Sequence, residues 1–353
     1  MTGSMRGPAI MLSQFIGDRP PFDSLDGIVG WAASLGYRGI QLPIHDRRIF
    51  DVERAAFDDG YCEAVNATIA GRGIAISELA AHRAGQLLAV HPALDDAADV
   101  FAPPDVRGAP AARRAWADAA LRRSIAACSR LGVRRLAVFS GALAWPYFYP
   151  WPPAPRGLVD TAFEELARRW RPLLDMADSA DVDLCFELHP GEDLHDGATF
   201  DRFLALVGDH RRARILYDPS HMLLQHMDYV GFIDRYHARI AAFHVKDAEF
   251  VRSDRSGVYG GYLDWRDRPG RFRSAGDGQI DFKSVFSRLA HHGYEGWAVL
   301  EWECCLKHPQ DGAREGAMFI ADHIIRVSDR AFDAALRPPV DNAAIHRMLG
   351  LAR

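Results

Sequence analysis

Cysteine is scarce in this chain, and the cysteines that are present form no familiar pairing. They are Cys62, Cys128, Cys185, Cys304 and Cys305, an odd number without a C-x-x-C pair. Such usage is typical of reduced thiols in a cytosolic protein and argues against a disulfide framework. The first 17 residues lack the apolar segment and cleavage site of a secretory signal, so we expect a cytoplasmic protein.

Clusters of positive charge and long apolar runs are missing as well. Lysine and arginine total 42 against 47 acidic residues, which gives a net charge of −5, and no basic tract occurs. Nucleic acid is therefore a poor electrostatic partner. The least charged long stretch, residues 141–155, contains five prolines and cannot form a membrane-spanning helix. We expect neither a nucleic-acid partner nor a membrane partner.

The chain does have enough apolar sequence for a large core, and this sequence alternates regularly. Hydrophobic residues make up 48% of its 353 residues, and charged residues make up 25%. Eight short apolar runs alternate with segments of helical length, at 9–12, 39–42, 74–79, 136–139, 184–188, 215–217, 241–245 and 296–301. Buried parallel strands have this pattern, which predicts an α/β fold, a (β/α)8 TIM barrel in a single domain. A doubly wound sheet is the alternative, but no G-x-G-x-x-G motif follows the first run.

The domain limits follow from the same alternation. We expect a loose tail at residues 1–8, the barrel at 9–329 and a C-terminal extension at 330–353. The extension should pack on the outside of the barrel or reach a neighbouring subunit.

Three connections stand out by their length or composition. They are residues 82–110, the aromatic and proline-rich loop 145–155, and the polar insertion 249–279. Long connections inside a compact domain usually serve function. We expect the loop 145–155 and the insertion 249–279 to cover the active site.

Four of the apolar runs end in a carboxylate or an imidazole. Glu187, Asp218, His244 and Glu301 occupy equivalent positions at the ends of four successive strands, where a barrel enzyme keeps its chemistry. Two glutamates, an aspartate and a histidine make a hard, oxygen-rich ligand set that suits Mn²⁺, Mg²⁺ or Co²⁺ and also accepts Zn²⁺. Each acid alone could be a strand-end cap or an ion-pair partner, but four at equivalent positions favour a metal site.

Short motifs around these four residues resemble a known family. They are FELHP at 186–190, DPSH at 218–221, HVKD at 244–247 and EWE at 301–303. Over residues 9–327 the chain resembles the sugar phosphate isomerase/epimerase family, xylose isomerase-like TIM barrels of the AP endonuclease family 2 superfamily. The resemblance implies one divalent ion, Mn²⁺ before the others, held by Glu187, Asp218, His244 and Glu301, with Glu303 as an alternative to Glu301. It also implies a small carbohydrate substrate.

The acid–base groups are expected among the same residues. Glu187 and Glu301 are the first candidates for carrying protons, and both are also expected ligands. His189 and His221 are the alternative bases, because an imidazole has a better intrinsic pKa for the task.

Substrate contacts are expected from residues near the strand ends and on the covering loops. The candidates are His221, Lys246, Arg273, Trp151, Glu78 and His82. Each has a structural alternative: His221 could cap its helix, Lys246 could pair with Asp247, and Arg273 could be a solvated loop residue. Trp151 could simply pack in a lid, since aromatic faces stack on sugar rings but also fill loops.

The favoured function is a divalent-metal-dependent sugar isomerase or epimerase acting on a ketose or keto-sugar through an enediolate held at the metal ion. The alternative is a metal-dependent lyase in which the same proton abstraction lets the aglycone of a 3-keto-glycoside leave by β-elimination. The aromatic loop 145–155 would suit a bulky aglycone. A non-catalytic sugar-binding barrel is a third hypothesis, although no ligand is missing.

Two further expectations concern partners. A DNA-repair endonuclease with this barrel would need a histidine after the fourth strand and an Asp-x-His after the seventh, and neither is present. We therefore reject that function. We expect a homo-oligomer, with or without a small accessory subunit.

Overall fold

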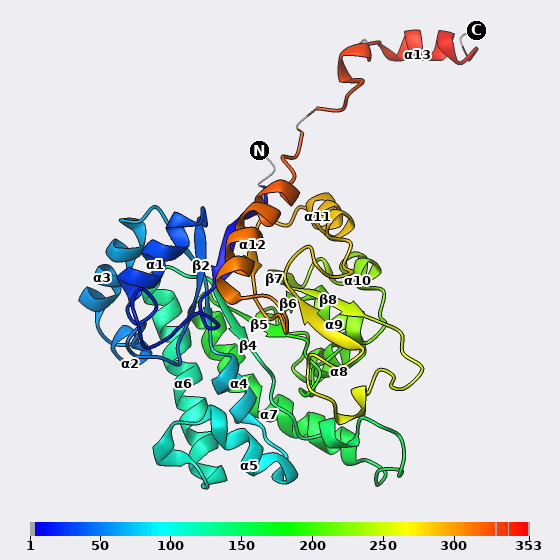
Figure 1. Ribbon diagram of the computed structural model, residues 1–353. Helices are drawn as coiled ribbons and strands as arrows, with labels where there is room; N and C mark the ends of the chain where they lie inside the picture. Colours follow the sequence, from blue (N-terminus) through cyan, green and yellow to red (C-terminus); the bar gives the residue numbers. More distant parts are fainter. Residues whose placement is uncertain (1–3, 329, 338, 352–353) are drawn as a thin grey trace.

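The computed structural model describes residues 4–328, 330–337 and 339–351. Eight parallel strands close into a barrel in the order β1-β10-β7-β6-β5-β4-β3-β2 (Figure 1). The barrel strands are β1 (Arg6–Met11), β2 (Gly39–Pro43), β3 (Ala75–Ala80), β4 (Arg135–Val138), β5 (Asp183–Glu187), β6 (Ala213–Tyr217), β7 (Ile240–Val245) and β10 (Trp297–Leu300). The predicted (β/α)8 barrel in a single domain is confirmed.

The first strand corrects the predicted tail. β1 begins at Arg6, whose backbone N–H donates to the Gly296 carbonyl oxygen at 2.8 Å, so part of the predicted 1–8 tail is strand. The sequence does not predict this start of β1, because the segment Arg6-Gly7-Pro8 contains glycine and proline, which are uncommon in strands.

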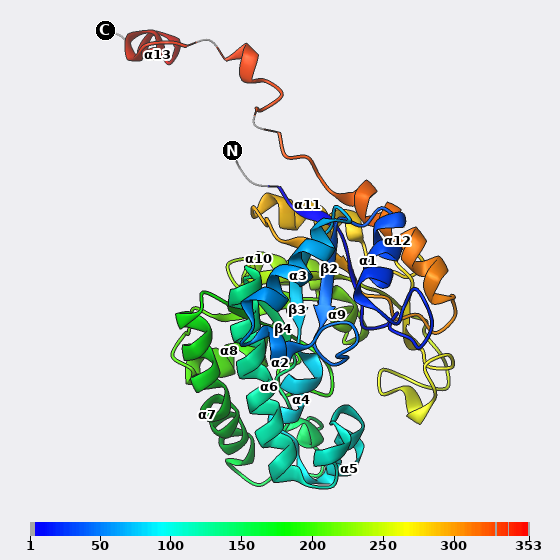
Figure 2. The ribbon, with the colours of Figure 1, turned by 90° about the vertical axis from the view of Figure 1, so that its left-hand side faces the viewer.

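Helices surround the barrel with their apolar faces turned inward (Figure 2). They are α1 (Leu25–Ser34), α2 (Val52–Ala55), α3 (Asp59–Ala70), α4 (His82–Leu88), α5 (Asp95–Ala98), α6 (Pro110–Leu131), α7 (Leu158–Ser179), α8 (Gly197–Leu206), α9 (Pro219–Leu224), α10 (Tyr229–Tyr236), α11 (Phe282–His291) and α12 (Pro309–His323). One further helix, α13 (Asn342–Met348), lies apart from the barrel in the C-terminal segment. Two helices, α2 and α3, lie between β2 and β3. Asp58 ends the continuity because its carboxylate caps α3, accepting from the Tyr61 N–H.

The two longest connections are folded. Residues 82–110 contain α4, α5 and short 3₁₀ turns, and the insertion 249–279 begins and ends in an antiparallel hairpin of β8 (Asp247–Phe250) and β9 (Gly270–Arg273). The carboxylate of Asp247 accepts backbone N–H groups from Ala248, Gly276, Gly278 and Ile280, which fastens the insertion to the end of β7. These hydrogen bonds fix both ends of the insertion beside the barrel mouth.

The C-terminal segment leaves the barrel after α12. Both ribbon views show it projecting away from the barrel and ending in α13 (Figures 1 and 2). The described part of residues 330–353 therefore does not pack on the barrel exterior, and contact with a neighbouring subunit stays a prediction. Among the described residues, no helix has the length and apolarity needed to cross a membrane.

Candidate metal centre and active site

The four residues singled out at the strand ends meet at one point inside the barrel mouth. Glu187 is the last residue of β5, His244 lies near the end of β7, and Asp218 and Glu301 directly follow β6 and β10. One ligand atom from each lies within 4.8 Å of the others, and all four side chains are buried. Because β5, β6, β7 and β10 are neighbours in the barrel, the register alone brings these groups together.

Two carboxylate oxygens in this cluster accept no hydrogen bond. They are Glu187 Oε2 and Asp218 Oδ2, although His82 Nε2 and Lys246 Nζ lie within ion-pair distance of them. Asp218 is oriented by its other oxygen, which accepts from the Ser220 N–H at 2.8 Å. Buried acceptors of this kind, in an oxygen-rich set with one imidazole, fit a divalent cation.

His244 is held in a defined orientation by Gln41 on β2. The amide nitrogen and the amide oxygen of Gln41 lie 3.0 Å and 3.3 Å from His244 Nε2, and the opposite ring nitrogen, Nδ1, lies 2.9 Å from Glu301 Oε2. If the Gln41 amide turns its oxygen to accept the Nε2 proton, Nδ1 becomes free to act as a ligand. Burial alone lowers the pKa of His244, but the carboxylates of Glu301 and Glu187 outweigh burial and raise it to about 10.

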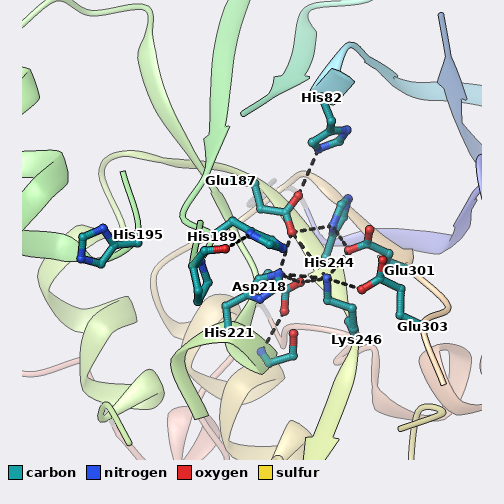
Figure 3. A network of polar contacts seen from close by, with 12 residues as sticks. His82, Glu187, His189, His195, Asp218, His221, His244, Lys246, Glu301 and Glu303 are labelled. Carbon is teal, nitrogen blue, oxygen red and sulfur yellow. Dashed lines mark hydrogen bonds and ion pairs between the residues drawn. The ribbon is translucent and has the colours of Figure 1, made fainter. Parts of the chain in front are cut away.

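Lys246 places a second cationic group against the same carboxylates (Figure 3). Its Nζ lies 2.8 Å from Glu301 Oε2, 3.0 Å from Asp218 Oδ2 and 3.3 Å from Glu303 Oε2. The predicted alternative, an ion pair with Asp247, is wrong because the Asp247 carboxylate is taken up by backbone N–H groups. Burial raises the carboxyl pKa values, but Lys246 and the imidazoles hold the pKa of Glu187 and of Glu301 below the ordinary value.

Two histidines form the wall between the cluster and the open cavity. His221 Nε2 lies 3.1 Å from Glu187 Oε1 and 2.9 Å from Lys246 Nζ, and the His189 and His221 rings are 4.1 Å apart. Burial lowers the pKa of His189 and of His221 to about 4. Both imidazoles are therefore neutral near pH 7 and can accept a proton, as weak bases.

His82 and Glu303 complete the inner ring of polar groups. His82 Nε2 lies 3.1 Å from Glu187 Oε2, so His82 borders the cluster, and its contact with a substrate stays a prediction. Glu303 contacts Lys246, and burial together with Glu301 and Glu187 raises its pKa to about 7, against the influence of Lys246. The Glu303 side chain is 40% exposed, so solvent screening will reduce this shift.

Two cavities open above the cluster and share His189, Trp265 and Phe272. The first, which we call the aromatic cavity, has a volume of about 470 Å³ and is walled by Trp145, Phe148, Tyr259, Trp265 and Phe272. The second, of about 480 Å³, is bordered by Gln14, Trp302, Glu303 and the two neighbouring cysteines Cys304 and Cys305. Such volumes are ordinary for small-molecule sites.

The aromatic cavity is roofed by the two segments expected to cover the site. Trp145 and Phe148 stack at 4.7 Å on the loop after β4, and Phe148 meets Tyr259 of the insertion at 6.1 Å. Trp151, the aromatic residue chosen from the sequence, is 74% exposed and lines neither cavity. Trp145 and Phe148 of the same loop line the cavity instead, and a contact between Trp151 and a substrate stays a prediction.

Two other expected substrate contacts lie away from the cavities. Arg273 on β9 donates to Glu249 Oε2 at 2.7 Å and lines neither cavity, because its partner on β8 holds it within the hairpin. Glu78 on β3 is fully buried in the barrel interior, where burial raises its pKa, and it also lines neither cavity. Their expected contact with a substrate stays a prediction.

Sequence reasoning missed two glutamines. Gln41 orients His244, and Gln14, just after β1, donates to Glu301 Oε1 at 3.2 Å. Gln41 could have been found, because a polar residue in the middle of an apolar strand that faces a barrel interior needs a partner there. Gln14 follows its strand in a loop and carries no such signal.

Comparison with known proteins agrees with this geometry. A profile of the family "Xylose isomerase-like TIM barrel" matches residues 29–323. An inosose dehydratase from Lacticaseibacillus casei is 29% identical over 147 residues, which is 41% of this chain and 48% of that protein. One from Bacillus velezensis is 31% identical over 144 residues, again 41% and 48%. The chain thus spans about half the length of the curated relatives it matches.

A solved structure agrees on the fold over a longer range. The 3-keto-D-glucoside 4-epimerase from E. coli superposes with a TM-score of 0.60 at 15% identity, covering 89% of this chain and 98% of that one. Since the family profile spans most of the barrel, from α1 to α12, this chain belongs to the xylose isomerase-like TIM barrel family.

Proposed function

We propose that this protein is a divalent-metal-dependent enzyme that removes a proton from the carbon next to the carbonyl of a keto-sugar, and so isomerises or epimerises it. The observation that carries the proposal is the buried cluster of Glu187, Asp218, His244 and Glu301 beneath a cavity of small-molecule size. A divalent ion held by these four residues, Mn²⁺ before Mg²⁺, Co²⁺ or Zn²⁺, would supply polarisation of the carbonyl and adjacent hydroxyl oxygens.

The chain itself supplies the proton carriers. Glu187 and Glu301 come from β5 and β10, which are separated in the barrel by β6 and β7, so they approach a substrate from different sides. One carboxylate takes the proton from carbon and leaves an enediolate. For epimerisation, the other group returns a proton to the opposite face of the same carbon. For isomerisation, the proton is delivered to the neighbouring carbon.

Other residues of the site assist in ways that follow from their charge. The Lys246 ammonium lies among the carboxylates and can stabilise negative charge on a substrate oxygen. The neutral imidazoles of His189 and His221 are the alternative bases, and Glu303 faces the second cavity as a further proton carrier. Aromatic side chains around the cavity would exclude water and stack on the sugar.

The test is exchange of the substrate proton with solvent deuterium, measured by NMR with the Mn²⁺-loaded protein and a panel of ketoses and 3-keto-glycosides. Glu187→Gln and Glu301→Gln should each slow exchange by at least about 100-fold, the scale of a lost acid–base group. If both variants still exchange while the His189→Gln and His221→Gln variants do not, the carboxylates only bind metal. If Glu303→Gln alone loses exchange, Glu303 is the base.

A lyase is the second candidate, and one observation favours it: the matched curated relatives are named dehydratases. After the same proton abstraction, a leaving group on the β-carbon departs with its electron pair, giving an α,β-unsaturated ketone. The leaving group would be the aglycone of a 3-keto-glycoside or, in a dehydration, hydroxide that leaves as water. Mass spectrometry separates the candidates, because an isomerase or epimerase conserves the substrate mass and a lyase does not. A non-catalytic sugar-binding barrel would bind substrate without any deuterium exchange.

A further inference from the structure

A large cavity lies outside the candidate active site, on the other side of α4. This cavity, which we call the outer pocket, has a volume of about 560 Å³ and shares no lining residue with the two cavities above the metal cluster. Its walls are the connection after β2, the start of α2, α4, residues 100–107 and the middle of α6. Much of it is thus built by the long connection between β3 and α6, for which the candidate active site provides no role.

The wall formed by this connection is a fixed structure. Arg113 on α6 is only 2% exposed and forms ion pairs with Asp95 and Asp99, which ties α5 and the following turn to α6. Asp99 Oδ2 also accepts from the Gly108 N–H at 2.6 Å. A small apolar cluster that includes Leu87 and Ala117 packs beneath. The pocket is therefore pre-formed.

The charge of the lining is positive. Four arginines, Arg47, Arg83, Arg107 and Arg123, face two carboxylates. One of these, Glu53, is already shared between Arg47 at 2.6 Å and Arg123 at 3.4 Å.

Two of the four arginines keep free donors. In the part of the chain that the structure describes, Arg83 makes no hydrogen bond or ion pair. Arg107 uses only its Nε, which donates to the Ala102 carbonyl oxygen at 2.9 Å. Burial lowers the pKa of the neighbouring His45 to about 4, with Arg83 adding to that effect, so His45 adds no charge near pH 7.

An apolar, partly aromatic surface stands beside these guanidinium groups. Trp116 and Phe101 line the same pocket, together with Val100 and Ile44. Guanidinium groups bind phosphate oxygens through several parallel N–H···O bonds, and a flat ring can stack on an indole face. A phosphate dianion has more acceptor oxygens than a carboxylate, so it can accept hydrogen bonds from several guanidinium donors at once.

We propose that the outer pocket binds a small phosphate monoester whose body is a flat ring, as in a mononucleotide. The phosphate lies against Arg83 and Arg107, and the ring lies against Trp116. This site is separate from the metal cluster and holds whether or not the proposed reaction is correct. α4 borders both regions, because His82, the residue before Arg83, contacts Glu187.

Isothermal titration of the Mn²⁺-loaded protein tests this proposal with AMP, fructose 6-phosphate, inorganic phosphate and neutral adenosine as probes. AMP should bind once per chain with a Kd below about 1 mM, more tightly than adenosine, and added salt should weaken it. Arg83→Gln should weaken AMP binding about tenfold, as expected for a lost charge-assisted hydrogen bond. The exposed Arg134→Gln is the matched control and should bind AMP like the wild type.

Two further variants assign the parts of the ligand. Trp116→Leu should weaken AMP but not inorganic phosphate, and Glu301→Gln should leave AMP binding unchanged because the metal cluster is elsewhere. AMP that binds no better than adenosine would overturn the proposal. So would AMP binding that survives Arg83→Gln but is lost in Glu301→Gln, since the phosphate would then sit at the metal. If the Trp116→Leu variant binds both AMP and inorganic phosphate with the affinities of the wild type, the ring does not contact Trp116, and that outcome would overturn the role assigned to the ring.

Discussion

The ammonium of Lys246 lies 2.8 Å from Glu301 Oε2, inside the set of carboxylates that would hold a divalent ion. A divalent cation and an ammonium attract the same oxygens and repel one another. Replacing Lys246 by methionine should therefore raise the affinity for Mn²⁺ by about tenfold or more, measured by isothermal titration. The same variant should lose activity if the ammonium stabilises a substrate oxygen. An unchanged Mn²⁺ affinity would mean that Lys246 swings clear of the carboxylates when the ion binds.

Gln41 should matter to the metal although it is not a ligand. Gln41→Leu removes the group that fixes the His244 ring, and the affinity for Mn²⁺ should fall by about 10- to 100-fold, as is usual for the partner of a ligating imidazole. Gln41→Glu, which keeps an acceptor for the Nε2 proton, should retain most of the affinity. Equal weakening in both variants would show that Gln41 acts through packing rather than through this hydrogen bond.

The roof of the aromatic cavity gives a matched pair of tryptophans on one loop. Trp145→Ala removes a ring from the cavity, and the KM for a keto-glycoside with an aromatic aglycone should rise by about tenfold, the scale of a lost stacking contact. Trp151→Ala, on the exposed side, should behave like the wild type. A larger effect at Trp151 than at Trp145 would show that the loop rearranges around substrate.

Glu192, on the loop after β5, predicts a pH dependence of stability. It is 2% exposed, and burial raises its pKa from 4.5 to about 8. The fold therefore favours the protonated carboxyl, whose contribution to stability is complete below pH 4.5 and is lost as the pH rises through about 8. Glu192→Gln mimics the protonated form, and its Tm should exceed that of the wild type by at least about 3 °C at about pH 8.5. At about pH 4.5 the two proteins should melt alike, and a pH-independent difference would contradict the raised pKa.

The sequence predicts the barrel and the cluster for a simple physical reason. Each apolar run that becomes a parallel strand buries both faces, so a polar residue in its last two positions or directly after it emerges at the barrel mouth. Glu187, Asp218, His244 and Glu301 are placed by that rule alone, without knowledge of the loops. The same rule brings His82 to the site, because it follows β3 by two residues.

What the sequence does not predict depends on how loops fold back. Trp151 and Trp145 have the same local composition, and only the path of the loop decides which ring faces the cavity. Arg273 donates a hydrogen bond to Glu249 across a β-hairpin. The sequence does not predict this hairpin, because the polar insertion that contains it shows no regular pattern. The outer pocket depends on Arg113 pairing with residues 14 and 18 positions earlier, a contact without periodicity in the sequence. Neither a homo-oligomer nor an accessory subunit is tested by the fold of one chain, and both stay predictions.

The central claim is that four strand-end residues together hold one divalent ion, and metal content measured on the purified protein tests it most directly. After dialysis against Mn²⁺, Co²⁺ or Zn²⁺, inductively coupled plasma mass spectrometry should find about one ion per chain in the wild type. Asp218→Ala and His244→Ala should lose the ion, while Asp247→Asn, whose carboxylate faces backbone N–H groups outside the cluster, should keep it. Wild-type protein that gains no stoichiometric metal under any of these conditions, or Asp218→Ala and His244→Ala variants that retain a full ion, would contradict the account.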